Sequence, residues 1–377
     1  MSKHPDVAVI GGGIIGLTAA YFLAKDGAAV EVLDRSDLGR EASWAGAGII
    51  PPGDPDRAAT PADRLRAVGS ARFPALSAEL RELTGIDNGY LRCGGIEFLH
   101  PADEYVLPLW RAEGIAFERL TRDGLKKLEP AVDDVAGEPY LLPGCAQVRN
   151  PWHLRALVAA CERIGVRLRP HEPVGKFITD NRRVTAVRLN DGREVSAGSF
   201  LIAAGAWSEE FLEQLGHRPN VHPVRGQIAL FNPSRPLLSR VLMLGKEYLV
   251  PRGDGRILVG STEEPEAGFE KANTPGAVAK LTALARRTVP ALADAPVEKC
   301  WAGLRPGSPD GLPLLGSVPG YDNTFVAAGH FRAGVQLSVG TAQLIAELLH
   351  GRPTSIPLEP FRLDRTPVPD SRPAFRS

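Results

Sequence analysis

The ten residues Val7-Ala8-Val9-Ile10-Gly11-Gly12-Gly13-Ile14-Ile15-Gly16 lie near the start of the chain. The four apolar residues at 7–10 predict a buried strand of a parallel sheet. The glycines Gly11, Gly13 and Gly16 follow in the spacing G-x-G-x-x-G. In this motif the first glycine makes a tight turn, the second lets the backbone approach a pyrophosphate, and the third lets the following helix pack on the sheet.

A helix and a second strand follow the glycine turn. Residues 14–26 have helical character that ends at Gly27, and residues 30–34 alternate like a strand that stops on Asp34. The helix N-terminus supplies N–H groups and partial positive charge for phosphates, and the Asp34 carboxylate can accept hydrogen bonds from a ribose diol. A lone glycine triplet is a weak signal. Strand, triplet, helix, strand and acid in one run of about thirty residues favour dinucleotide binding.

Length and composition narrow the class of protein. The 377 residues exceed a single typical core, so we expect two domains. The 44 basic and 44 acidic residues cancel, which gives no electrostatic reason to expect a nucleic-acid partner. No apolar run approaches the length of a membrane span, and the fold begins by about residue 6, so we expect no integral membrane segment, no cleaved signal peptide and a cytoplasmic location. The cysteines Cys93, Cys145, Cys161 and Cys300 are far apart, without a C-x-x-C pair, and indicate neither a metal site nor a disulfide framework.

Three regions follow the opening unit. Residues 39–50 are rich in Gly, Ala and Ser, which is typical of backbone pressed against a flat ligand. Residues 64–84 predict a helix that is interrupted near Pro74. Residues 86–148 mix short strands and turns without a β-α-β rhythm.

A second α/β unit begins near residue 150. Asn150 is the expected N-cap and Pro151 the first residue of a helix that Gly165 ends, and a strand follows from Val166. The later elements expected from the pattern are a hairpin at 174–196 with its turn at 190–192, a strand at 200–207, strands over 222–262, a helix at 275–290, a strand at 324–329 and a helix at 335–350.

These elements predict an α/β fold with a Rossmann-type nucleotide-binding domain and an inserted, mostly antiparallel α+β substrate domain. Both ends of the chain and a middle segment would build the first domain. We expect it to comprise residues 1–85, 145–215 and 320–377, and the substrate-binding domain to comprise residues 86–144 and 216–319.

The opening fingerprint reaches further than a generic nucleotide site. It is Gly11-x-Gly13-x-x-Gly16-x-x-x-Ala20-x-x-Leu23-x-x-x-Gly27-x-x-Val30-x-Val32-x-Asp34, which resembles the flavoprotein version of the fold. Four later stretches add to it: EASWAGAG at 41–48, YLVPR at 248–252, WAGLRPG at 301–307 and FVAAGHFRAG at 325–334. On these motifs the chain is similar, from about residue 5 to about residue 365, to the D-amino-acid oxidase and sarcosine oxidase superfamily of FAD-dependent oxidoreductases. Within it the chain most resembles the glycine oxidases, which are associated with thiamine biosynthesis.

The resemblance implies a Rossmann-type FAD-binding domain that holds FAD noncovalently. Related sarcosine oxidases link the flavin through a cysteine, but the corresponding stretch around Gly303 has none. Many relatives carry Glu where this chain has Asp34, whose shorter side chain can still reach a ribose. The residues implied to touch FAD are Gly11, Gly13, Ile14, Ile15 and Gly16 at the pyrophosphate turn, Asp34 and Arg35 at the ribose, Ala42, Ser43, Ala47, Gly48 and Ile49 along the diphosphate and flavin, Val174 near the adenine, and His330, Phe331, Arg332, Ala333, Gly334, Val335 and Gln336 at the flavin carbonyl end.

Oxidation of an amine by a flavin sets three demands. The protein must fix the substrate carboxylate, aim the Cα–H bond at flavin N5 and exclude water. The planar, bidentate donor of arginine suits a carboxylate, and Arg305 and Arg332 are the candidates. By the resemblance both contact the substrate, and the Tyr248 hydroxyl closes the carboxylate end. No general base is required for a substrate whose amine binds neutral, so no catalytic acid or base is assigned.

Other polar and aromatic residues are interpreted as structural or solvated. For Glu263 and Glu264 two interpretations stay open, a position at the rim of the pocket and a solvated turn, and the solvated turn is favoured. We expect His330 to act through its backbone. Trp44 and Trp301 are expected to pack in the core.

The predicted function is FAD-dependent oxidation of glycine or another small amino acid, such as sarcosine or a short D-amino acid. Hydride transfer from Cα to flavin N5, with O2 as acceptor, gives H2O2, NH3 and the 2-oxo acid. A D-amino-acid or proline-type dehydrogenase that passes electrons to a quinone or a protein stays open. A nicotinamide-dependent enzyme is disfavoured, because Gly253-Asp254-Gly255 lacks the third glycine and the helix of a second motif. By analogy with glycine oxidases we expect a homotetramer.

Overall fold

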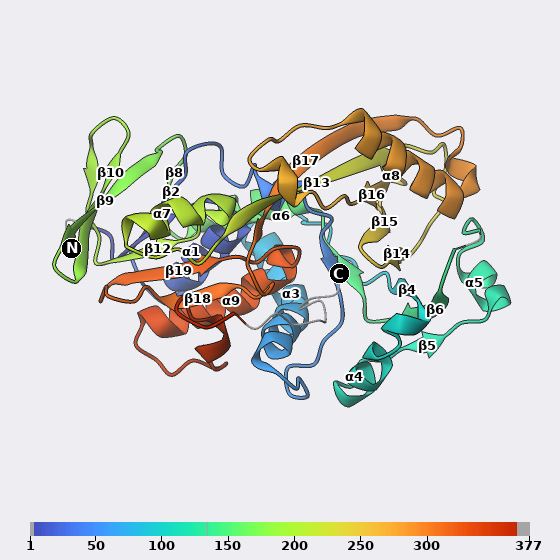
Figure 1. Ribbon diagram of the computed structural model, residues 1–377, viewed down its shortest axis with the longest axis horizontal. Coiled ribbons are helices and arrows are strands. Elements are labelled where there is room, and N and C mark those ends of the chain that lie inside the picture. The colour runs from blue at the N-terminus through green and yellow to red at the C-terminus, as the bar shows by residue number, and fades with distance from the viewer. Residues whose placement is uncertain (1–3, 134, 368–377) are drawn as a thin grey trace.

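The computed structural model describes residues 4–133 and 135–367. Two large sheets organise the molecule, one in each half of its elongated shape, with helices packed on them (Figure 1). The helices are α1 (Ile14–Lys25), α2 (Ala42–Ala45), α3 (Pro61–Thr84), α4 (Val106–Ala112), α5 (Arg122–Leu128), α6 (Asn150–Arg163), α7 (Ser208–Gln214), α8 (Pro275–Thr288) and α9 (Gly334–Leu349).

The first large sheet has six strands. In spatial order they are β18 (Leu314–Ser317), β19 (Thr324–Ala328), β12 (Ser199–Ile202), β1 (Val7–Ile10), β2 (Val30–Leu33) and β8 (Arg167–Arg169). Neighbouring strands are parallel except for β18 and β19. The opening β-α-β unit is therefore confirmed, and strands from distant parts of the chain extend it.

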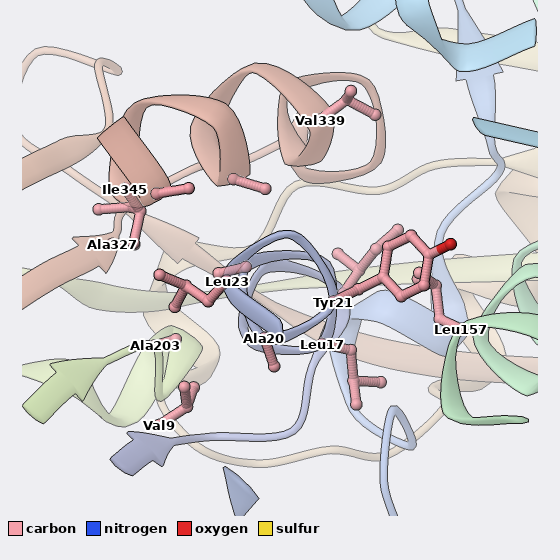
Figure 2. Close-up of a cluster of buried hydrophobic side chains, with 14 of the residues drawn as sticks. Val9, Leu17, Ala20, Tyr21, Leu23, Leu157, Ala203, Ala327, Val339 and Ile345 are labelled. Carbon is pink, nitrogen blue, oxygen red and sulfur yellow. The ribbon is translucent and has the colours of Figure 1, made fainter. Parts of the chain in front are cut away.

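Helix α1 lies at the centre of this half. Its side chains are apolar or small on nearly every side, which is typical of a helix enclosed in a core. Figure 2 shows Leu23 directed toward Ile345 of α9, while Tyr21 lies on the side of Leu157 of α6. Because α1 packs against helices from the middle and the end of the chain, those segments hold the first nucleotide-binding helix in place.

The glycine turn is required by close packing of backbone on backbone. A Cβ atom on Gly16 would lie 1.9 Å from the carbonyl oxygen of Gly11. Gly11 itself has φ +111°, and a Cβ there would lie 2.4 Å from the oxygen of Ala203 in the loop after β12. Both positions therefore exclude side chains for steric reasons.

Two predicted helix features differ in the structure. Helix α3 runs unbroken through Pro74, so the predicted interruption is wrong. Its buried side chains Phe73 and Leu80 pack in the core, and this tertiary contact outweighs the backbone hydrogen bond that proline removes. Helix α6 begins at Asn150 itself, after Arg149, so the predicted N-cap is also wrong. The Asn150 amide instead donates to the carbonyl oxygen of Ser43, at 2.7 Å.

The predicted hairpin at 174–196 is part of a sheet of three antiparallel strands. These are β9 (Val174–Asp180), β10 (Arg183–Leu189) and β11 (Glu194–Val195). The predicted turn at 190–192 joins β10 to β11, and a second turn, which the prediction missed, joins β9 to β10. That turn contains Asn181 at φ +50°, a conformation that asparagine tolerates better than most residues.

The second large sheet has eight strands and is antiparallel except between β14 and β4. In spatial order they are β17 (Val297–Gly307), β13 (His222–Phe231), β16 (Ile257–Gly260), β15 (Glu247–Pro251), β14 (Val241–Leu244), β4 (Gly95–Leu99), β6 (Glu138–Leu142) and β5 (Glu118–Arg119). Helix α8 covers one face through Leu281 and Leu284. The predicted strands over 222–262 and the helix near 275–290 are confirmed.

The two large sheets take their strands from different stretches of the chain. Strand β18 pairs with β19 in the mainly parallel sheet, although the expected boundaries place it in the substrate-binding domain. The boundaries themselves stay a prediction. A two-stranded pair, β3 (Ile49–Ile50) and β7 (Ala146–Gln147), lies outside both large sheets. No helix in the described ranges is long and apolar enough to span a membrane.

Replacing Gly16 by alanine tests the close approach in the turn. We expect Gly16→Ala to lower the free energy of unfolding by about 1–3 kcal/mol, because the opposing atom belongs to the backbone and cannot rotate away. Urea unfolding measures the change. The matched control is Gly276→Ala in the first turn of α8, where a Cβ meets nothing within 4 Å and the change should stay within about 0.5 kcal/mol. Equal losses in both variants would contradict the packing argument.

A buried histidine gives the fold a pH dependence. His153 is 0% exposed and lies against Phe73, and burial lowers the pKa of its ring from 6.5 to about 3. The folded state therefore keeps the ring neutral, and stability falls once the pH drops below the unfolded pKa. Because of His153, the free energy of unfolding should fall by about 2 kcal/mol when the pH is lowered from 7 to 5. Urea unfolding of His153→Asn at both pH values should show a correspondingly smaller drop, and an unchanged drop would exclude this origin.

Candidate active site

A cavity of about 410 Å³ lies between the two large sheets. From the first sheet it is lined by residues that follow the carboxyl ends of strands, among them Gly11 after β1, Asp34 after β2 and Ala203 after β12. From the second sheet it is lined by Tyr248 on β15 and Arg305 on β17. Ligands of open α/β sheets bind at this edge, and the volume is in the range of small-molecule sites.

The cavity gathers the predicted cofactor and substrate residues. Gly16 alone of that set is not among the lining residues, and its place is the packing contact beneath the turn. The residues that line the cavity are Gly11, Gly13, Ile14, Ile15, Asp34, Arg35, Ala42, Ser43, Ala47, Gly48, Ile49, Val174, Tyr248, Arg305, His330, Phe331, Arg332, Ala333, Gly334, Val335 and Gln336. Their individual contacts with a cofactor stay predictions.

The turn before α1 forms one end of the cavity and fits a dinucleotide. The Gly12 N–H donates to Asp34 Oδ2 at 2.7 Å, and the Ile14 N–H donates to Ser43 Oγ at 2.9 Å. Gly13 lines the cavity, and a Cβ there would lie 3.2 Å from Ser43 Oγ. A helix N-terminus beside bare glycine backbone is a place where a diphosphate can come close.

A partly buried arginine contacts the small-residue loop that forms one wall of the cavity. Arg252 Nη2 donates to the carbonyl oxygen of Ala47 at 2.7 Å, and Nη1 donates to Gln147 Oε1 at 2.9 Å. Burial lowers the pKa of Arg252 to about 10, and the charge of Arg149 adds to the shift. Sequence reasoning assigned Arg252 no role, although it ends the YLVPR stretch. Its contacts identify it as a positioning residue for the loop.

The outer edge of the cavity is bridged by contacts that sequence reasoning missed. The Arg35 guanidinium lies 3.6 Å from the ring centre of Trp207, and Trp207 lies 5.4 Å from Phe269. Lys271 Nζ lies 2.7 Å from a carboxylate oxygen of Glu41. Phe269 and Lys271 belong to the segment between β16 and α8, so this segment reaches from the second sheet to the nucleotide side. Sequence pattern alone does not bring these residues together.

Arg305 forms the centre of the opposite end. Its Nη2 donates to Ser261 Oγ at 2.6 Å, and its Nη1 donates to the carbonyl oxygen of Thr262 at 3.1 Å. Burial lowers the pKa of Arg305, interaction with Tyr248 opposes that shift, and the charge of Arg332 adds to it. In residues 4–133 and 135–367 no carboxylate lies within ion-pair distance of Arg305.

The strand beside Arg305 carries a glycine where the guanidinium lies. Gly226 on β13 lies next to β17, and a Cβ on Gly226 would lie 2.1 Å from Arg305 Nη1. The glycine therefore leaves the space that the guanidinium occupies. Tyr248, 6% exposed, also lines the cavity and interacts with Arg305. Its contact with a substrate carboxylate stays a prediction.

Arg332 also lines the cavity, but it has an acidic partner. Its Nη1 lies 3.0 Å from Glu263 Oε2, and its Nη2 donates to the carbonyl oxygen of Lys246 at 2.6 Å. The interpretation of Glu263 and Glu264 as a solvated turn is wrong. Glu264 pairs with the buried Arg225 on β13 at 2.7 Å. Both acids are therefore structural parts of this end of the site.

His330 is buried and neutral. Its Nε2 lies 3.0 Å from the hydroxyl of Thr341, and burial lowers the pKa of the ring to about 3. The ring therefore carries no proton that it could donate as an acid near neutral pH. The predicted backbone contact of His330 to a flavin stays a prediction.

Known proteins resemble this chain over nearly its whole length. The family of FAD dependent oxidoreductases matches residues 6–348. Glycine oxidase of Pseudomonas putida is 36% identical over 363 residues, which cover 96% of this chain and 98% of that protein. The bifunctional protein ThiO/ThiG of Synechocystis is 35% identical over 360 residues, which cover 93% of this chain and 52% of that protein. The crystal structure of glycine oxidase from Geobacillus kaustophilus superimposes with a TM-score of 0.90 at 32% identity, and covers 97% of this chain and 100% of that chain.

Replacing Gly226 by alanine tests the space that it leaves for Arg305. The new methyl group displaces the end of a flexible side chain and leaves the backbone in place, so the fold should survive. We expect the dissociation constant for acetate, a minimal carboxylate ligand, to rise at least about tenfold. Isothermal titration calorimetry measures it, with Gly253→Ala as the control because a Cβ there meets nothing within 4 Å. Unchanged acetate binding in Gly226→Ala would show that the Arg305 position is not critical.

Proposed function

The chain belongs to the family of FAD-dependent oxidoreductases, and from that membership we propose that it oxidises glycine and other small amino acids with O2 as the electron acceptor. FAD is its cofactor, and its class of activity is that of an FAD-dependent amino-acid oxidase. The proposed reaction converts the amino acid, O2 and water into the 2-oxo acid, NH3 and H2O2. For glycine the 2-oxo acid is glyoxylate.

The observation that carries the proposal is the position of Arg305. A guanidinium at a cavity wall, with no carboxylate partner among the described residues, is stabilised by an anion that enters the cavity. The carboxylate of an amino acid matches the planar donor geometry of arginine. Tyr248 lies at the same end and can donate its hydroxyl to that carboxylate.

The protein's part in the mechanism is to bind and orient. When bound, FAD supplies the chemistry of accepting a hydride from Cα and passing the electrons on to oxygen. Arg305 fixes the carboxylate, which limits the directions in which the Cα–H bond can point. Burial lowers the pKa of the His330 ring to about 3, so the ring is too weak a base to remove a proton from a substrate ammonium group. The proposed substrate therefore binds with its amine already neutral.

The nucleotide side would hold FAD along the cavity. Gly11, Gly13 and Ile14 would take the diphosphate, and Asp34 and Arg35 the ribose. No cysteine is among the described residues that line the cavity, which supports noncovalent binding. The similarity to the ThiO/ThiG protein suggests that the product serves thiamine biosynthesis. The homotetramer and the cytoplasmic location stay predictions.

A peroxide assay on the purified protein and its Arg305→Ala variant tests the proposal. We expect H2O2 with glycine, sarcosine or D-alanine in air from the natural sequence. In Arg305→Ala we expect the KM to rise about 30-fold or more, because truncating one partner of a buried charge pair costs about 2–5 kcal/mol. The amount of bound FAD should not change, since Arg305 lies at the other end of the cavity from the glycine turn.

The matched control is Arg256→Ala, which removes an arginine that pairs with Glu298 away from the cavity. Turnover with a quinone or a dye but without peroxide would favour the dehydrogenase alternative. Loss of FAD in Arg305→Ala would show that the carboxylate role is wrongly assigned.

A further inference from the structure

We propose that Glu263 restricts this enzyme to amines that carry a single carboxylate. The inference rests on the proposed function in one respect, namely that the substrate carboxylate binds at Arg305. It concerns the second arginine of the cavity, Arg332, and what Glu263 does to it. The charge of Glu263, which lies outside the cavity, decides how many carboxylates this end of the site accepts.

Glu263 is tied to two cations. Its Oε2 lies 3.0 Å from Arg332 Nη1, and its Oε1 lies 2.7 Å from Lys246 Nζ. Burial opposes the charge of Glu263, but the hydrogen bonds from Lys246 and Arg332 outweigh burial and hold the pKa of this carboxyl below its usual range. Glu263 is therefore ionised at neutral pH.

The two cavity arginines differ in their partners. Arg305 donates to a hydroxyl and a backbone carbonyl, whereas Arg332 donates to a carboxylate and a backbone carbonyl. Among the described residues no carboxylate lies within ion-pair distance of Arg305, whereas Glu263 lies 3.0 Å from Arg332. The charge of Glu263 also acts on Arg305, but less than the opposing charge of Arg332 does. The third cation, Lys246, has a side chain that is 72% exposed, so solvent screens it. Of these three cations, Arg305 is therefore the one with which the carboxylate of a ligand can pair directly.

A second carboxylate on the substrate would therefore meet an occupied site. Two of the three nitrogens of Arg332 already donate to Glu263 and to Lys246. The negative charge of Glu263 also repels an anion that approaches Arg332, and like charges facing each other in a partly buried site are costly. Amines with one carboxylate escape this penalty because their carboxylate binds at Arg305 and they bring no second anion to Arg332.

The consecutive residues 261–264 have different partners, so the effect on Arg332 belongs to Glu263. Ser261 and Thr262 hold Arg305, and the next residue, Glu263, holds Arg332. Glu264 then pairs with Arg225, which anchors the segment to β13. Removing only the charge of Glu263 therefore leaves the support of Arg305 intact.

The test compares the holoenzyme with its Glu263→Gln variant, using acetate and malonate as probes with one and two carboxylates. The change of the flavin absorbance spectrum on titration gives each dissociation constant without turnover. In Glu263→Gln we expect the dissociation constant of malonate to fall about tenfold or more and that of acetate to change less than about threefold. Relative kcat/KM for iminodiacetate against glycine should rise in the same direction.

Glu298→Gln is the control, because it removes an equal charge that pairs with Arg256 far from the cavity. Glu263→Ala serves as a second variant where Glu263→Gln retains too little FAD. Unchanged malonate affinity in both variants, or equal gains for acetate and malonate, would overturn the role of Glu263. Failure of the natural sequence to bind either probe, or to oxidise any small amino acid, would instead refute the carboxylate site on which the proposed function rests.

Discussion

The end of the cavity formed by the second sheet depends on Arg305, a cation with no carboxylate within ion-pair distance in residues 4–133 and 135–367. The Arg305 guanidinium donates to a serine hydroxyl and to a backbone carbonyl in the wall of the cavity. It occupies the space that a side chain on Gly226 of the adjacent strand would fill. Neutral acceptors orient a guanidinium but do not balance its charge. In the proposed function an anionic ligand completes the electrostatic balance of the site, so binding and charge compensation are one event.

The segment after β16 connects this cation to the rest of the molecule. Its first residues hold both cavity arginines, and its later residues Phe269 and Lys271 reach the nucleotide side at Trp207 and Glu41. One continuous piece of chain thus contacts the substrate end and the outer edge of the cofactor side. The same backbone segment therefore contacts Arg305 and Arg332 and also links the two sheets.

Short-range patterns predicted most of the fold. The glycine spacing, the acid at position 34 and the alternating strands depend on neighbours within about thirty residues, and the structure confirms the elements that they indicate. Pro74 was misjudged because burial of its neighbours, a long-range effect, decides the outcome. Glu263, Arg252 and Trp207 were missed or misread, since each acquires its partner from a distant segment and, in sequence, resembles an ordinary loop or strand residue.

The order of strands in the mainly parallel sheet has a consequence for biosynthesis. β1 is made first, but its neighbour β12 lies near residue 200, and β19 and α9, which complete the core around α1, come after residue 320. A nascent chain on the ribosome therefore carries an unfinished apolar core through most of its translation. Contacts of such long sequence separation form slowly and expose hydrophobic surface in the meantime. Helix α9 is thus the element that completes the packing around α1, the helix that follows the glycine turn.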